Sequence, residues 1–250
     1  MIITTSGRRV RRIGIAAAAT ASAAVGISLV APMAAHADAK DACSGVKAPC
    51  TIVAQVDVTG DGKPDSVGIV TQKSSYGQTT RYQVRVRTAD GKLLRKTDKH
   101  ASWEGKLFYG AAAIDGTPGK DLVVGHVAGA HTAFYHVLSY HDGKFVLRKA
   151  PKLPAAVGKD INTNVRSWVV DSAASSFAGI RRTVSQHQVS LSEDFGSRDP
   201  NAPQYTGWHL VYRWSGDHWA PVSHHQKKWT DKQASTKWGW HVKGLKRGLF

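Results

Sequence analysis

The segment VDVTGDGKPDSVGIV, residues 56–70, carries the pattern from which the fold can be worked out. An apolar strand ends at Asp57, a turn rich in Asp, Gly and Pro follows, and Asp65 begins a second apolar strand. Gly and Pro favour tight turns because they supply positive or fixed φ angles, and Asp side chains bond to nearby backbone groups. The segment therefore predicts a strand, a tight acidic loop and a second strand.

The same pattern occurs again at AIDGTPGKDLVVG, residues 113–125. Each copy is followed by two alternating strands around Asp-Gly, in RYQVRVRTADGKLLRK (81–96) and AFYHVLSYHDGKFVLRKAP (133–151). GWHLVYRWSGDHWAPV (207–222) has a similar form around Gly-Asp. Asp-Gly between alternating strands is a strong hairpin signal, because a type I′ turn needs positive φ at both central residues.

The repeated unit therefore has four strands and recurs after about 50 residues, which is the length and strand count of one propeller blade. We expect three units, at 51–97, 107–151 and 164–223, of which the third has lost the aspartate pattern. Three units are fewer than the roughly four to eight blades of a closed propeller. The sequence predicts an all-β fold of antiparallel, four-stranded, blade-like repeats, arranged as a partial β-propeller or a sandwich-like stack.

The first acidic loop offers oxygen ligands at alternate positions. They are the side chains of Asp57, Thr59, Asp61 and Asp65 and the carbonyl of Lys63. Calcium takes six to eight oxygens on a flexible loop, and Gly62 allows the sharp turn that such a loop needs. An EF-hand would need Glu where Gly68 stands. A plain structural turn explains the same residues without a metal, so both interpretations stay open.

At this point the loop resembles the D-x-D-x-D-G-x-x-D motif of FG-GAP and VCBS repeats, the blade repeats of integrin-α-type propellers. The resemblance covers about residues 51–150. It implies a β-propeller-like fold and a binding rather than a catalytic role. It also implies calcium, held by Asp57, Asp61 and Asp65 with the carbonyl of Lys63.

The chain departs from the motif of these repeats in three places. Thr59 stands where Asp or Asn is usual. In the second unit Asp115 and Asp121 match the outer two ligand positions, but the central acid is missing and the loop is shorter. The Phe-Gly-Gly-Ala-Pro-like segment of these repeats is not present in the sequence. We therefore expect the second copy to be free of metal.

Residues 1–37 predict an export signal that is cleaved before Asp38. Four arginines precede an apolar run at 13–30, and small residues at Ala35 and Ala37 suit the cleavage site. An N-terminal membrane anchor is the alternative, but the run consists mostly of Ala, Gly and Ser. We expect a secreted, extracellular protein with no integral membrane span after cleavage.

The chain has two cysteines, Cys43 and Cys50. In an exported protein such a pair predicts a disulfide, which here would hold the N-terminal segment 38–50. Half of a metal site is the weaker interpretation, because no second cysteine pair exists.

The formal charge is +16, and it falls to +12 without the four arginines of residues 1–37. Such a cationic chain is attracted to polyanions. The C-terminal segment 224–250 interleaves basic residues with tryptophan, a combination that suits stacking and charge pairing. The candidate polyanion-binding residues are Lys227, Lys228, Trp229, Lys237, Trp238, Trp240, Lys243, Lys246 and Arg247. The alternative is a solvated tail whose tryptophans cap the β-core.

His126, His131, His136 and His141 recur every five residues. Because an odd spacing alternates between the faces of a strand, we expect half-buried or surface histidines rather than a zinc site. A groove is the other possibility, with His131 and Thr132 as the first residues to consider. Since the chain has no G-x-S-x-G, H-E-x-x-H or P-loop motif, we assign no catalytic residue.

These observations favour a secreted, non-catalytic β-repeat protein, stabilised by calcium, that binds anionic cell-wall or other surface polymers. One alternative is a secreted hydrolase with a His/Asp site around residues 126–141. Another is an extracellular binder of nucleic acid or lipid surfaces that acts through the basic C-terminal segment. Convergent His and Asp side chains in one pocket would favour the hydrolase, and three carboxylates directed at one centre would favour calcium.

Overall fold

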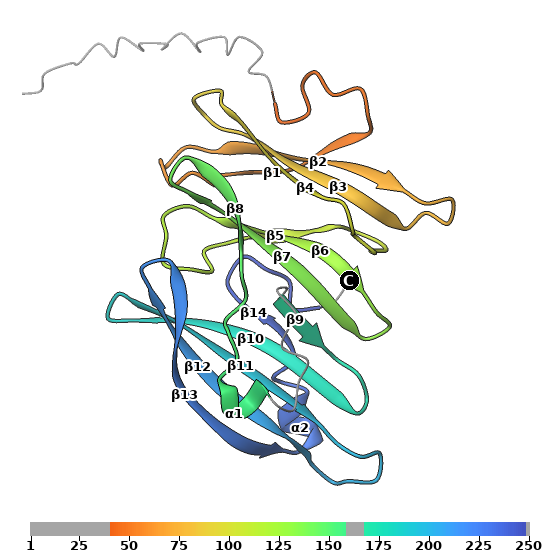
Figure 1. Ribbon diagram of the computed structural model, residues 1–250, viewed down its shortest axis with the longest axis vertical. Coiled ribbons are helices and arrows are strands. Elements are labelled where there is room, and N and C mark those ends of the chain that lie inside the picture. The colour runs from red at the N-terminus through yellow and green to blue at the C-terminus, as the bar shows by residue number, and fades with distance from the viewer. Residues whose placement is uncertain (1–40, 159–167, 249–250) are drawn as a thin grey trace, which may run out of the picture. The chain divides into compact units, whose positions relative to one another are not determined.

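Strands make up more than half of the described chain, and every strand pair except β10 with β14 is antiparallel (Figure 1). The computed structural model describes residues 41–158 and 168–248, which belong to a unit spanning Asp38–Phe250. The expected export signal and the start of the expected third unit, 164–167, lie outside the described residues. No helix of the described part is long and apolar enough to cross a membrane.

The first sheet has four strands that pair in chain order. They are β1 (Cys50–Val56), β2 (Asp65–Lys73), β3 (Thr79–Arg87) and β4 (Leu93–Asp98). Alternation along β3 buries Tyr82, Val84 and Val86 in the core. The first expected unit, 51–97, is a four-stranded antiparallel sheet, and β3 and β4 form the expected hairpin. Its turn is not the expected type I′, because Gly91 has positive φ (+87°) but Asp90 does not.

The second sheet has ten strands, in the order β13-β12-β11-β10-β9-β7-β6-β5, with β8 beside β7 and β14 beside β10. The strands of the second expected unit are β5 (Phe108–Ala112), β6 (Asp121–Ala128), β7 (Thr132–His141) and β8 (Lys144–Arg148). The later strands are β9 (Trp168–Asp171), β10 (Ser176–Ser185), β11 (Gln188–Ser197), β12 (Tyr205–Ser215), β13 (His218–Trp229) and β14 (Gly239–His241). Two short helices complete the described elements, α1 (Ala155–Gly158) and α2 (Asp231–Ala234).

The second and third units share one sheet and are not separate blades. Strand β7 is long enough to pair with two strands on the same edge, with β9 through residues 132–135 and with β8 through 137–141. The sheets do not close into a barrel, and the fold is all-β and sandwich-like. The boundary expected at residue 223 falls inside β13, so the segment 224–250 begins within the sheet.

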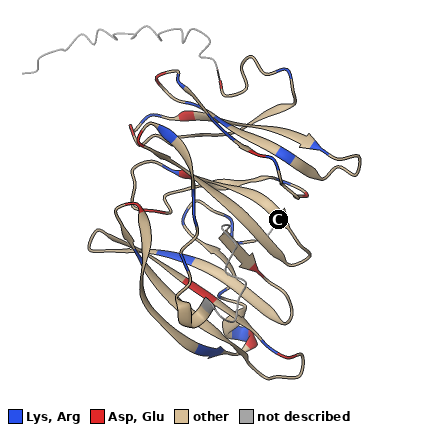
Figure 2. Ribbon diagram, in the orientation of Figure 1, with Lys and Arg blue, Asp and Glu red and all other residues tan. Residues whose placement is uncertain are grey.

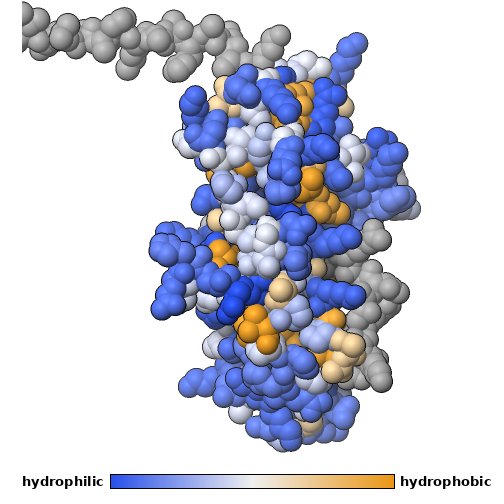
Figure 3. Space-filling model, turned by 60° about the vertical axis from the view of Figure 1, so that its left-hand side comes forward, coloured by the Kyte–Doolittle hydropathy of each residue, from blue (hydrophilic) through white to orange (hydrophobic). Residues whose placement is uncertain are grey.

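Buried side chains of the described residues form two core clusters. The larger cluster joins both sheets and includes Val84 on β3 and Tyr135 on β7. The smaller cluster belongs to the second sheet and α2 and consists of Phe177, Tyr205, Trp229 and Ala234. Trp103 lies so close to Gly125 that a Cβ there would be 2.3 Å from the indole ring. At one end of the sandwich, the ammonium group of Lys92 donates to the carbonyl of Gly143, at 3.0 Å. On the face shown in Figure 3, hydrophobic residues form only small, separate patches.

Candidate functional site

The first acidic loop is a turn whose carboxylates bind backbone amides. Oδ1 of Asp57 accepts from the N–H of Gly60 at 2.6 Å, and Oδ2 accepts from that of Gly62 at 2.9 Å. Oδ1 of Asp61 accepts from the N–H of Lys63 at 2.8 Å. These are the local side chain-to-backbone bonds that make Asp common in turns.

Asp65, the last expected calcium ligand, is fully buried. Its Oδ2 accepts from the N–H groups of Val58 (2.8 Å) and Thr59 (3.0 Å), and its Oδ1 accepts from that of Ala89 (2.9 Å). Both oxygens of this carboxylate thus serve the backbone, as do both oxygens of Asp57. The arrangement favours the structural turn over the calcium site, and calcium binding by this loop stays a prediction.

The second loop repeats this bonding. Oδ2 of Asp121 accepts from the N–H groups of Ile114 (2.7 Å) and Asp115 (3.2 Å). These donors lie seven and six residues before the aspartate, as in the first loop. Asp115 therefore corresponds to Thr59, and its expected match to the outer position of Asp57 is wrong.

A different group of residues converges on one point. Asp98, His126 and His136, which we call the Asp–His centre, are the only described residues that place three possible metal-ligand atoms within 4.8 Å of one another. Nδ1 of His126 lies 2.6 Å from Oδ2 of Asp98, and Nδ1 of His136 lies 3.4 Å from the same oxygen. The two imidazole rings stack with their centroids 4.1 Å apart.

The strands explain why the two histidines meet. His136 on β7 is paired with Val124 on β6, and His126 lies two residues further along β6, on the same face. A β-bulge at His126 leaves this residue without a partner on β7. Bulges re-aim side chains locally. The His126 carbonyl instead accepts from the N–H of Ser102, at 2.8 Å.

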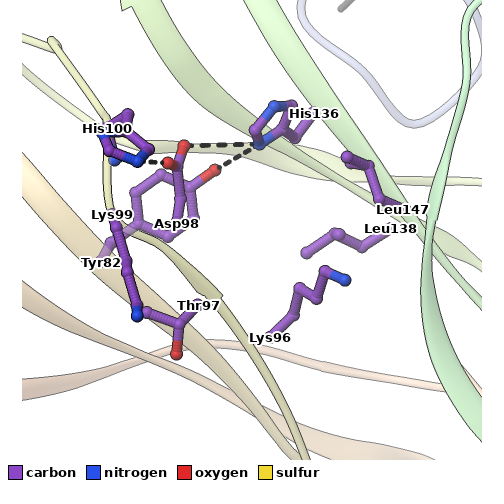
Figure 4. Close-up of a pocket in the computed structure, with 9 residues that line it drawn as sticks. All are labelled: Tyr82, Lys96, Thr97, Asp98, Lys99, His100, His136, Leu138 and Leu147. Carbon is purple, nitrogen blue, oxygen red and sulfur yellow. Dashed lines mark hydrogen bonds and ion pairs between the residues drawn. The ribbon is translucent and has the colours of Figure 1, made fainter. Parts of the chain in front are cut away.

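Asp98 and Tyr82 are the residues of the first sheet that lie at the Asp–His centre. They are opposite each other on β4 and β3, on the face that looks into the core. Figure 4 shows Asp98, Tyr82 and His136 pointing toward one another. The phenol oxygen of Tyr82 lies 3.1 Å from Nδ1 of His136. Oδ1 of Asp98 accepts from the N–H of His100 at 2.9 Å.

The surroundings set the protonation of these groups. Burial, reinforced by the charge of His126, lowers the pKa of His136 to about 4, so its ring is neutral at pH 7. Burial and the charge of Asp98 raise the pKa of Tyr82, so its hydroxyl can donate to Nδ1 of His136. Burial alone would raise the pKa of Asp98, but the bonds from His126 and from the His100 N–H lower it. Asp98 is therefore a carboxylate that accepts from Nδ1–H of His126.

The centre can be reached from solvent. An open pocket of about 280 Å³ borders Asp98, Tyr82 and His136, with Lys96 on its other side (Figure 4). The side chains of His126 and His136 are 21% and 16% exposed, and that of Asp98 is 7% exposed. A small ion can therefore approach without opening the core.

The two other histidines of the five-residue series lie apart from the centre. His131 is exposed, and His141 lies beside Asp142 at 3.2 Å. Thr132 donates to Asp171 at 2.7 Å, and the groove expected at His131 and Thr132 stays a prediction. The regular five-residue spacing did not indicate which histidines meet, because His126 and His136 lie on neighbouring strands. No sequence motif indicates Asp98.

Cys43 and Cys50 form the expected disulfide. Trp229 and Trp240 are 1% and 2% exposed, so the ligand-stacking role expected for them is wrong, because both belong to the core. Trp238 is partly buried.

The basic residues of the C-terminal segment are in part engaged. Lys237 lies 3.4 Å from Asp194, and the guanidinium of Arg247 lies over the ring of Trp238 at 4.8 Å. The remaining candidates are exposed, namely Lys227, Lys228, Lys243 and Lys246. The polyanion-binding surface expected there therefore lacks two of its three tryptophans, Trp229 and Trp240, and binding by the remaining residues stays a prediction.

The chain was compared with family models, curated proteins and solved structures, and none of them matches it. The resemblance to FG-GAP and VCBS repeats thus stays a prediction.

Proposed function

We propose that this chain is an exported β-sheet protein that binds a zinc-class divalent ion at the Asp–His centre. The observation that carries the proposal is the convergence of two imidazole nitrogens and one carboxylate oxygen within 4.8 Å, beside a pocket. Support for export comes from the Arg-rich, apolar pattern of residues 1–37 and from the Cys43–Cys50 disulfide.

The ligand set selects the kind of metal. Imidazole suits Zn²⁺, Cu²⁺ and Ni²⁺, whereas Ca²⁺ takes six to eight oxygen ligands. Zinc binds nitrogen and carboxylate oxygen at about 2.0–2.2 Å, which the three atoms can reach with small side-chain movements. Three protein ligands leave a fourth position, which water can fill from the pocket.

A neighbouring backbone group would orient one of these ligands. The N–H of His100 donates to the second oxygen of Asp98, at 2.9 Å. Such outer contacts fix the position of metal ligands and tune their affinity. On binding, Tyr82 would lose its bond to Nδ1 of His136, and His126 would release its Nδ1 proton, since ligands must be deprotonated.

Metal binding should also stabilise the fold. Asp98 belongs to the first sheet and the two histidines belong to the second, so one ion would join both. A ligand that binds only the folded state adds roughly 4 kcal/mol to the free energy of unfolding when its free concentration is about 1,000 times its Kd.

The test is a zinc titration of the purified, EDTA-treated protein, followed by its melting temperature and by calorimetry. We expect zinc to raise the Tm of the wild type and of the His131→Ala and His141→Ala controls, which keep the centre intact. Asp98→Asn and His126→Ala should lose the shift. An equal shift in all variants, or no shift in the wild type, would refute the proposal.

A second candidate function follows from the same geometry. A zinc ion with three protein ligands and an open position can activate water for hydrolysis. The pocket beside Asp98 and His136 gives a substrate access. Zinc-dependent cleavage of activated esters or phosphodiesters that Asp98→Asn abolishes would establish this hydrolase function. Zinc binding without turnover would leave the binding function alone.

A further inference from the structure

Four arginines share the face of the first sheet that points away from the core. Arg81, Arg85 and Arg87 alternate on β3 with the buried Tyr82, Val84 and Val86. Arg95 on β4 is paired with Arg85 and so lies on the same face. We call Arg81, Arg85, Arg87 and Arg95 the arginine face.

The pairing of Arg85 with Arg95 is unfavourable in the protein alone. Residues directly opposite in an antiparallel pair have Cβ atoms about 4.5–5.5 Å apart, and like charges there are destabilising. Burial, followed by the charges of Arg95 and Arg87, lowers the pKa of the Arg85 guanidinium. The sheet thus holds cations together at some expense in stability.

No acid in the described part of the chain relieves this repulsion. None of the four arginines forms an ion pair within residues 41–158 and 168–248. Arg85 donates only to neutral acceptors, the carbonyl of Ala42 at 2.7 Å and Oε1 of Gln83 at 3.1 Å. Arg87 donates to the carbonyl of Gly91 at 2.9 Å, and its buried Nε–H has no acceptor there.

We propose that the arginine face binds a linear polyol-phosphate polymer, whose phosphodiester groups neutralise Arg81, Arg87 and Arg95. Side chains on one face of a strand recur about every 6.6–6.8 Å. Arg85 and Arg87 are one such step apart, and Gln83 lies between Arg81 and Arg85. Arg85 is only 7% exposed because it is covered by Ala42, so the accessible cations are Arg81, Arg87 and Arg95. Guanidinium groups match phosphate geometry with two parallel hydrogen bonds. This inference is independent of the metal proposal.

The arginine face has no row of aromatic side chains on which bases could stack, and this favours a polymer without bases. Strands β1–β4 contain one aromatic residue, Tyr82, and it is buried in the core. The exposed Tyr76 lies in the turn between β2 and β3, where a single ring cannot stack on successive bases. Surfaces for single-stranded nucleic acid combine charge with several such rings.

The C-terminal segment supplies a matched control. Figure 2 shows Lys and Arg on strands of both sheets. Lys227 and Lys228 are exposed on β13, in the second sheet, as Arg81 and Arg95 are exposed in the first. Replacing either pair by glutamine removes two positive charges, so the two double variants have the same net charge.

The experiment measures binding of labelled poly(glycerol phosphate) to the disulfide-bonded protein over a range of salt concentrations. We expect Arg81→Gln/Arg95→Gln to weaken binding by roughly tenfold or more, because charged hydrogen bonds are lost. The slope of the logarithm of the association constant against the logarithm of salt concentration should be less negative in this variant than in the wild type, by about 1.4. Lys227→Gln/Lys228→Gln should change affinity less than about twofold, as expected for charges that only attract at long range.

A second measurement keeps the test valid if a variant is poorly folded. Without polymer, Arg95→Gln should raise the Tm by roughly 1–3 °C, because the repulsion from Arg85 is removed. Equal loss of binding in both double variants would overturn the proposal in favour of general charge attraction. Tighter binding to a single-stranded oligonucleotide with the same number of phosphates would overturn it in favour of nucleic acid.

Discussion

The backbone N–H of Lys120 donates a 2.8 Å hydrogen bond to the carbonyl of Asp57, and this bond joins the two acidic loops. Glycine is required at the contact. A Cβ at Gly119 would lie 2.3 Å from the carbonyl oxygen of Val58, and one at Gly60 would lie 2.6 Å from Cβ of Pro118. The repeated loops are therefore docked against each other through their backbones.

Gly60→Ala should destabilise the protein more than Gly62→Ala. Both residues have φ of +81°, but a Cβ at Gly62 meets nothing within 4 Å. Gly62→Ala therefore carries only the backbone penalty, about 1–2 kcal/mol. Gly60→Ala adds a clash with Pro118, which should cost roughly 1–3 kcal/mol more. Urea denaturation measures the difference, and equal losses would contradict the docking of the loops.

Asp65→Ala should be far more damaging than Asp61→Ala. The first change leaves three backbone N–H groups without their acceptor, at about 1–3 kcal/mol for each one that stays buried. Asp61 is exposed and accepts one local bond, so its loss should stay within about 0.5 kcal/mol. Both losses can be measured by chemical denaturation. A Tm rise with millimolar calcium that Asp61→Ala removes would instead show that this loop holds calcium.

Asp121 should make the protein less stable as the pH rises from about 4 to 6. Burial and the charge of Asp115 raise the pKa of Asp121 to about 6, while Arg148 and Arg182 are the cations nearby. Between the unfolded value of about 3.9 and this folded value, the folded state binds more protons. Stability is therefore fully present below pH 4 and falls by at most roughly 2–3 kcal/mol toward pH 6.

Asp121→Asn is the variant that tests this pH dependence. The amide keeps an oxygen for the N–H groups of Ile114 and Asp115, but it does not titrate. Its unfolding free energy, measured by urea denaturation at several pH values, should vary less with pH between 4 and 6 than that of the wild type. An identical pH profile in both proteins would assign the dependence to other groups.

Removing the Cys43–Cys50 disulfide should cost roughly 2–3 kcal/mol on chain-entropy grounds, because it closes a short loop. The Cys43→Ser/Cys50→Ser variant should also loosen the cover over Gly68, whose Cβ position lies 3.0 Å from the Cys43 sulfur. Denaturation of the wild type with and without a reductant provides the comparison. If the wild type had the same free energy of unfolding with and without the reductant, the disulfide would not contribute to stability.

Much of the local structure could be predicted from the sequence, because its causes are local. Alternation in RYQVRVR and the Asp-Gly pair that follows indicate the β3–β4 hairpin. The Asp and Gly residues of 57–65 indicate the turn that the structure contains. The single cysteine pair indicated the disulfide.

The candidate site could be predicted only in part. Sequence spacing drew attention to the histidines of β6 and β7, but it pointed first to His131, which is exposed. Asp98 lies on a strand of the other sheet, 28 residues before His126. No local pattern says which residues of two sheets face each other, since this depends on how the sheets pack.

The sequence by itself therefore determined the β3–β4, β7–β8 and β12–β13 hairpins, the two acidic loops and the disulfide, all of which follow from residue preferences over short stretches of chain. The tertiary structure alone decided that β7 pairs with both β8 and β9, and that Trp229 and Trp240 are core residues. It also decided that Asp98 meets His126 and His136. These relationships arise when distant segments bury apolar surface together, and that choice depends on the whole chain.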